Sequence, residues 1–145
     1  MTEELISKEF NTQIRVIYAD TDQMGVVYHS KYLKYFEIGR NEMLREANFT
    51  YKYLESRNVY LPVIEAHLKY IKPARYDDIL IIKTKMSREI HKQLRFKMHC
   101  KIISENNELL VEGYTVHIIS NKEGKAWRAP KDVYYPLLEN IYKID

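Results

Sequence analysis

Two aspartates and a histidine lie close together near the start of this chain, within residues 19–40. Asp20 and Asp22 are two residues apart, and Gly25 follows them. His29 comes next, directly before a run with the spacing of a long helix. Carboxylate and imidazole side chains transfer protons and attack carbonyl carbons, and the first N–H groups of a helix are available to an anion. The segment therefore suggests either chemistry at a helix N-terminus or simple capping of that helix.

A metal site is a further possibility for this segment, but the spacing argues against it. A calcium loop starting at Asp20 would need oxygen ligands where the chain has Met24 and Lys31. A zinc site needs paired ligands such as HxxxH or CxxC, which are absent from the sequence. We therefore predict no metal. On the residues alone, a structural interpretation stays open: one aspartate caps the helix, the other forms an Asx turn, and His29 is a surface residue.

The composition indicates one globular domain, residues 1–145, with 46% hydrophobic and 30% charged residues. Residues 1–11 lack the basic start and apolar core of a secretory signal, and we expect them to form an N-terminal tail. The longest aliphatic run, residues 79–82, is too short to span a bilayer. Cys100 is the only cysteine, which fits a reducing compartment, so we expect a cytoplasmic protein with an inert thiol in its core.

The elements that must position the acidic segment are one strand before it and one long helix after it. Residues 12–19 alternate in polarity and predict a strand. Apolar residues recur at helical spacing over residues 30–47, which predicts a helix about 27 Å long. Short helical segments are expected at 49–58 and 131–143. Four further strands are expected, at 61–71, 78–88, 92–104 and 108–120. The gaps are too short for crossover helices, so the sequence predicts an α+β domain: a five-stranded antiparallel sheet wrapped around one long central helix.

Beyond these local patterns, the chain resembles a known family. The first motif comprises Tyr18, Asp20-Thr21-Asp22, Gly25-Val26-Val27-Tyr28-His29, Tyr32, Phe36-Glu37 and Arg40. A second, weaker motif comprises Tyr70 and residues 72–78. Together they are similar to the 4-hydroxybenzoyl-CoA thioesterase-like acyl-CoA thioesterases, particularly the Tol-Pal-associated branch. The resemblance covers about residues 12–135 and implies a hotdog fold. The bulky pair Gln23-Met24 departs from the small residues that the family often has, which bears on the shape of the acyl pocket.

The resemblance implies hydrolysis of an acyl-CoA or related pantetheine thioester without a cofactor. Asp22 falls on the family's essential carboxylate, which acts either as a general base or as a nucleophile. His29 falls on the second functional position, where it would orient Asp22 or water, or help to protonate the leaving thiolate. Gly25 and Tyr28 are expected at the turn that approaches the oxyanion, with the N–H groups of the helix start as donors. Asp20 is expected to form the turn.

The resemblance also bears on partners. The tentative substrate-binding residues are Tyr18, Arg88, His91, Lys92 and Arg128, the last four of which are suited to the phosphates of coenzyme A. Exposed sheet edges predict a homodimer or a dimer-of-dimers tetramer. We expect no nucleic acid partner, because the basic face of residues 92–104 lacks interleaved aromatic side chains, and no membrane insertion. The competing hypothesis is a hotdog protein that binds acyl-CoA without hydrolysing it, but Asp22 and His29 favour an enzyme.

Overall fold

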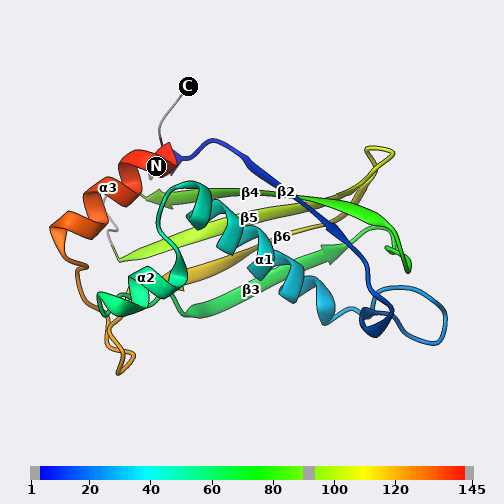
Figure 1. Cartoon of the computed structure of the whole chain (residues 1–145), viewed down its shortest axis with the longest axis horizontal. Coiled ribbons are helices and arrows are strands. Elements are labelled where there is room, and N and C mark those ends of the chain that lie inside the picture. Colours follow the sequence, from blue (N-terminus) through cyan, green and yellow to red (C-terminus); the bar gives the residue numbers. More distant parts are fainter. Residues whose placement is uncertain (1–3, 90–93, 143–145) are drawn as a thin grey trace.

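The computed structural model describes residues 4–89 and 94–142, in which helix α1 lies across one face of a curved antiparallel sheet (Figure 1). The sheet order is β1-β4-β5-β6-β3, and β2 also pairs with β4. The six strands are β1 (Glu4–Ile6), β2 (Phe10–Arg15), β3 (Val63–Tyr70), β4 (Ile79–Glu89), β5 (Arg95–Ser104) and β6 (Leu109–Ile118). Consecutive strands from β4 to β6 are neighbours, as the short connections predict.

The prediction of five strands is wrong, because strand β4 is long enough to pair with two short strands in succession. Its C-terminal end, from Ser87 to Glu89, pairs with β1. Its first part, from Ile79 to Thr84, pairs with β2. Part of the expected N-terminal tail, residues 1–11, is therefore in the sheet.

The first predicted strand, residues 12–19, also ends earlier than expected. Strand β2 stops at Arg15, and the chain then forms a short 3-10 helix, η1 (Tyr18–Asp20). Its turn is closed by two hydrogen bonds: the N–H of Asp20 donates to the carbonyl of Ile17 at 3.1 Å, and the N–H of Thr21 donates to the carbonyl of Tyr18 at 3.0 Å. This turn directs the chain out of the sheet and into the acidic segment.

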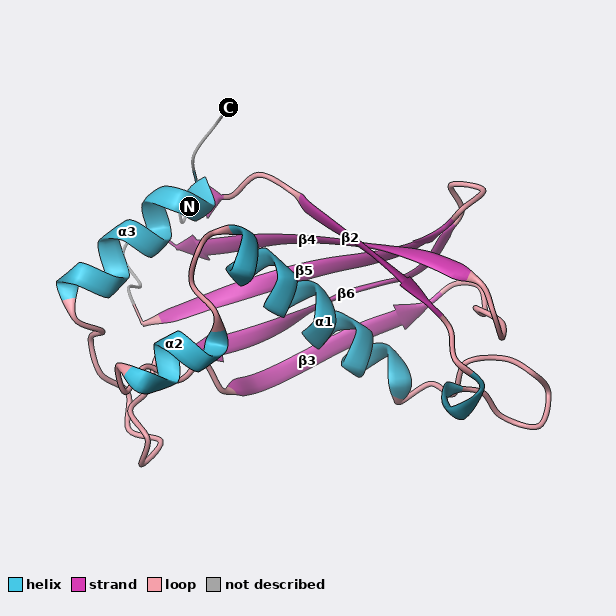
Figure 2. Ribbon diagram, in the orientation of Figure 1, coloured by secondary structure: helices cyan, strands magenta, loops and turns pink. Residues whose placement is uncertain are grey.

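Helix α1 (Lys31–Glu46) begins and ends within one residue of the predicted helix. Its buried face carries large side chains, including Tyr35, Phe36 and Met43. Gly39 lets the helix approach the sheet closely, since an added Cβ would lie 2.5 Å from the Thr84 hydroxyl of β4. Helices α2 (Tyr51–Ser56) and α3 (Lys131–Tyr142) lie at the far end of the sheet from the start of α1 (Figure 2).

The buried apolar side chains form two clusters along α1. One cluster lies under the first half of α1, near the acidic segment, and contains Val27, Tyr32, Phe36 and Cys100. The other lies between the end of α1 and α3. Burial raises the pKa of the Cys100 thiol to about 11, which fits the predicted core cysteine. Within the described residues, no helix has the length and apolar character required to cross a membrane.

Candidate active site

The acidic segment folds into a closed loop, residues 20–28, beside the start of α1. The N–H of Tyr28 donates to the carbonyl of Asp20 at 2.9 Å and closes the loop. Inside it, the N–H of Asp22 donates to the carbonyl of Val26 at 2.9 Å. Gly25 makes the return possible because its φ is +76°, in the left-handed region that favours glycine. Hydrogen bonds of its own backbone therefore close the loop.

A second segment, residues 74–76, holds the loop from outside. The N–H of Val27 donates to the carbonyl of Ala74 at 2.8 Å, and the N–H of Tyr76 donates to the carbonyl of Gly25 at 3.1 Å. The N–H of Ala74 in turn donates to the hydroxyl of Tyr32 on α1, at 3.1 Å. The loop and the helix start are therefore joined through a segment of the second sequence motif.

Asp22 is exposed on this loop. Its Oδ1 accepts a hydrogen bond from the N–H of Met24 at 2.8 Å and a longer one from the N–H of Val26 at 3.4 Å. Within the described ranges, its Oδ2 accepts no hydrogen bond. Asp22 thus forms the Asx turn considered in the structural interpretation, yet it keeps one carboxylate oxygen for water or a substrate. No side chain caps α1, whose N-cap residue is Ser30.

His29 is exposed in the turn just before α1 and is surrounded by aromatic rings. The centroid of its ring lies 4.4 Å from that of Tyr28 and 6.5 Å from that of Tyr70. The Tyr70 hydroxyl donates to the carbonyl of His29 at 3.3 Å. Across the part of the chain that the structure describes, no hydrogen bond joins the side chains of Asp22 and His29. The two residues share a short segment but remain separate groups.

The backbone N–H groups near α1 are not equally available to an anion. Those of Gly25 and Tyr28 already donate to carbonyls of the loop. The N–H of Lys31, the first residue of α1, donates to the carbonyl of Tyr28 at 2.9 Å. Among the described residues, the N–H groups of His29 and Ser30 donate to no partner. These two consecutive N–H groups are therefore the free donors, and the sequence did not single out Ser30.

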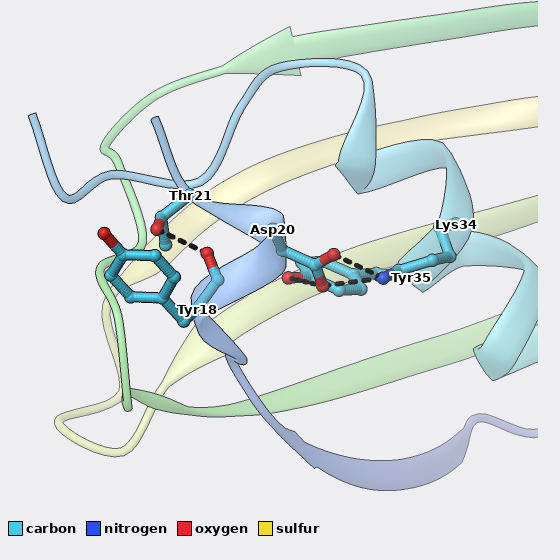
Figure 3. A network of polar contacts seen from close by, with 5 residues as sticks. All are labelled: Tyr18, Asp20, Thr21, Lys34 and Tyr35. Carbon is cyan, nitrogen blue, oxygen red and sulfur yellow. Dashed lines mark hydrogen bonds and ion pairs between the residues drawn. The ribbon is translucent and has the colours of Figure 1, made fainter. Parts of the chain in front are cut away.

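Asp20 has a very different environment from Asp22. It is only 4% exposed, and its carboxylate contacts two side chains of α1 (Figure 3). Lys34 Nζ lies 2.5 Å from Oδ1 and 2.7 Å from Oδ2, and the Tyr35 hydroxyl donates to Oδ2 at 2.9 Å. Burial alone would raise the pKa of Asp20, but the hydrogen bonds from Lys34 and Tyr35 outweigh burial and lower it. Asp20 is thus an ionised anchor as well as the expected turn residue.

The tentative substrate-binding residues are dispersed in a single chain. Tyr18 lies beside the loop, is 77% exposed and contacts the edge of the Tyr76 ring. Arg88 is near the end of β4, and Arg128 is three residues before the start of α3; that end of β4 and α3 both lie at the far end of the sheet from the start of α1 (Figure 1). His91 and Lys92 lie outside the described residues. Two cations next to the loop were not among the predicted substrate-binding residues: Lys31, in the first turn of α1, and Arg75 of the second motif, whose backbone pairs with that of Val26.

Comparison with known proteins identifies the family. The profile of the thioesterase-like superfamily matches residues 16–137. The chain belongs to the thioesterase-like superfamily. It is 38% identical over 103 residues to the acyl-CoA thioester hydrolase YbgC of Escherichia coli O6:H1, covering 71% of this chain and 75% of that protein. It is 33% identical over 122 residues to the acyl-CoA thioesterase YbgC of Haemophilus influenzae, covering 83% and 87% of the two chains.

A solved structure supports the same assignment. The crystal structure of the hypothetical protein TT1821 from Thermus thermophilus has a TM-score of 0.83 and 34% identity, and covers 95% of this chain and 100% of that one. The hotdog architecture expected for the thioesterase-like superfamily is therefore confirmed as an α+β fold with an antiparallel sheet and a helix.

Proposed function

We propose that this chain hydrolyses acyl-CoA or related pantetheine thioesters, and that it belongs to the Tol-Pal-associated branch of its superfamily. The observation that carries the proposal is the pairing of two features: an exposed Asp22 carboxylate with a free oxygen, and the free N–H groups of His29 and Ser30 a few residues away. A carboxylate and an oxyanion site are the two elements that thioester hydrolysis requires. The relatives named YbgC support the substrate class.

In the proposed reaction, the thioester carbonyl oxygen accepts hydrogen bonds from the N–H groups of His29 and Ser30. One such donor typically contributes about 2.7–4 kcal/mol to the transition state. Asp22 then either takes a proton from the attacking water or attacks the carbonyl carbon itself and is released by water. The carbon–sulfur bond breaks, and the thiolate takes a proton from a protonated His29 side chain (imidazolium) or from solvent. The donors are thus the N–H groups of the two residues just before α1, while those of the turn residues Gly25 and Tyr28 are occupied within the loop.

We further propose that the working form is at least a homodimer paired through the β3 edges. Strand β3 is at the edge of the sheet, and all but one of its residues are exposed. Antiparallel pairing of two β3 strands would bring the α3 end of one copy towards the Asp22 loop of the other. Arg88 and Arg128 of a second copy could then reach the phosphates of coenzyme A, and Lys31 and Arg75 could do so from the same chain.

An assay of thiol release from acyl-CoA substrates tests the function. We expect the wild-type protein to hydrolyse a short acyl-CoA or an aryl-CoA, and Asp22→Asn to lower kcat at least about a hundredfold. Asparagine can keep the hydrogen bond from the N–H of Met24, so circular dichroism and acyl-CoA binding should change little. His29→Ala should reduce the rate less, because the backbone donors remain. A chelator should have no effect, because the proposed reaction uses only the Asp22 carboxylate, His29 and backbone N–H groups.

Three results would contradict the proposal. Wild-type protein that binds acyl-CoA but releases no thiol would instead support a carrier or sensor of thioesters. Asp22→Asn protein with a rate within about three times that of wild type would place the catalytic group elsewhere. Activity lost with a chelator and restored by zinc would rule out the cofactor-independent mechanism.

A further inference from the structure

We infer that Lys34 and Tyr35 are positioning residues: by holding the Asp20 carboxylate, they fix the loop that carries Asp22 and the free N–H groups of His29 and Ser30. The inference rests on the proposed function. Neither Lys34 nor Tyr35 belongs to the first sequence motif.

Two side chains of α1 hold the Asp20 carboxylate by hydrogen bonds to both of its oxygens. Lys34 Nζ lies within hydrogen-bond distance of both oxygens, and the Tyr35 hydroxyl donates to one of them. A buried carboxylate is costly unless it is paired, so these contacts define one position for it. Lys34 keeps 41% of its side chain exposed, which means that its stem crosses the surface while its ammonium group points inward to Asp20 (Figure 3).

The backbone of Asp20 closes the loop of residues 20–28. Its carbonyl accepts the N–H of Tyr28, and the next residue, Thr21, pairs with Val27. Asp22 lies one residue further along the chain, and His29 directly follows Tyr28. A shift of Asp20 would therefore move both sides of the proposed site together.

A second connection explains why α1 controls the position of the loop. Tyr35 packs edge-on against Tyr32, with ring centroids 5.9 Å apart. The Tyr32 hydroxyl accepts the N–H of Ala74, whose carbonyl accepts the N–H of Val27. One turn of α1 thus holds the loop at Asp20 through Lys34 and Tyr35, and at Val27 through Tyr32. Loss of the first connection should leave the loop attached at Val27 but free to shift at Asp20.

The test compares Lys34→Met, Asp20→Asn and the double variant by steady-state kinetics. Lys34→Met should lower kcat about tenfold or more with KM within about threefold, because small displacements of reacting groups cost rate more than binding. The double variant should be no slower than the slower single variant, since Lys34 acts through Asp20. Lys34→Arg should recover activity to within about threefold of wild type. Lys83→Met is the matched control, because the Lys83 side chain forms a 3.8 Å ion pair with Glu9, away from the loop.

Amide hydrogen exchange of residues 20–28 provides a readout that does not depend on catalysis. Exchange in this loop should become at least about tenfold faster in Lys34→Met and stay unchanged in Lys83→Met. If Lys34→Met does not fold, Tyr35→Phe removes only a hydroxyl and should give a smaller change in the same direction in both measurements. If wild type has no activity on any thioester, the proposed function fails, while the exchange experiment still tests the connection.

Two outcomes would overturn the inference. The first is a folded Lys34→Met protein with kcat within about twofold of wild type and unchanged exchange in the loop. The second is additive loss of kcat in the double variant, which would mean that Lys34 acts on the substrate directly and not through Asp20.

Discussion

His117 should make this protein less stable in mild acid. The side chain is fully buried on β6 and stacked on Phe96, with ring centroids 5.2 Å apart. Its Nδ1 lies 2.9 Å from the Leu61 carbonyl, and its Nε2 lies 2.7 Å from the Thr115 hydroxyl. A carbonyl only accepts, so Nδ1 carries the hydrogen and Nε2 accepts from Thr115. The neutral ring is therefore fully satisfied, and protonation would place a charge in the core.

The size of the effect follows from the pKa. Burial lowers the pKa of His117 from 6.5 to about 4, and the nearby Arg40 adds to this. Between these two values the unfolded chain binds more protons than the folded one, so stability is present in full above pH 6.5 and is lost as the pH falls towards 4. From pH 7 to pH 4.5, linkage gives a loss of about 2 kcal/mol in the free energy of unfolding.

Urea unfolding of wild type and His117→Gln at pH 7 and pH 4.5, at one protein concentration, tests this value. Glutamine does not titrate, so the variant should be less stable at pH 7 but should lose about 2 kcal/mol less on acidification. Burial, Lys85 and Lys97 also lower the pKa of His99, which adds a loss common to both proteins, so the difference between them isolates His117. Equal losses in the two proteins, within about 0.5 kcal/mol, would refute the reasoning.

Two further predictions concern the core and the assembly. Burial raises the pKa of the Cys100 thiol from 9.0 to about 11, which lowers its thiolate fraction about a hundredfold at pH 8. A thiol reagent should therefore label the native protein at least about a hundredfold more slowly than the unfolded protein. Rapid labelling without denaturant would contradict this prediction. Sedimentation of the wild-type protein at micromolar concentration should give a mass of at least twice 17.5 kDa. Ile64→Asp, on the exposed β3 edge, should shift the measured mass towards that of the monomer. An active wild-type monomer would exclude the proposed assembly.

An element of the fold could be predicted from the sequence where its hydrophobic periodicity extends over many residues. The apolar spacing of α1 persists over four turns, so its ends were placed within one residue. Strand β1 has only three residues, too few for a pattern, and it was missed. The first strand was predicted too long because the alternation continues through Val16 and Tyr18, although pairing with β4 stops at Arg15. Alternation records which side chains could share a face, and hydrogen bonding decides where a strand ends.

Less of the candidate site could be predicted. The motif located Asp22 and His29, but it did not indicate which backbone donors are free, because that depends on the carbonyls that the loop brings near them. The lysine that holds Asp20 is 14 residues further along the chain, a separation that no local pattern connects. The positions of Arg88 and Arg128 near turns do not show whether they lie close to Asp22, because a turn can lie at either end of the sheet.

The two aspartates of the motif take opposite environments although only one residue separates them. The short helix η1 ends at Asp20 with that side chain directed at α1, and the loop that follows turns Asp22 outward. Substitution of either residue should therefore reduce activity, but for different reasons. A loss of rate in Asp20→Asn alone would not identify Asp20 as the base, because it would also release the loop. Loop exchange separates the cases: it should rise when Asp20 is changed and stay unchanged in Asp22→Asn, which removes the reacting carboxylate from a loop that keeps its position.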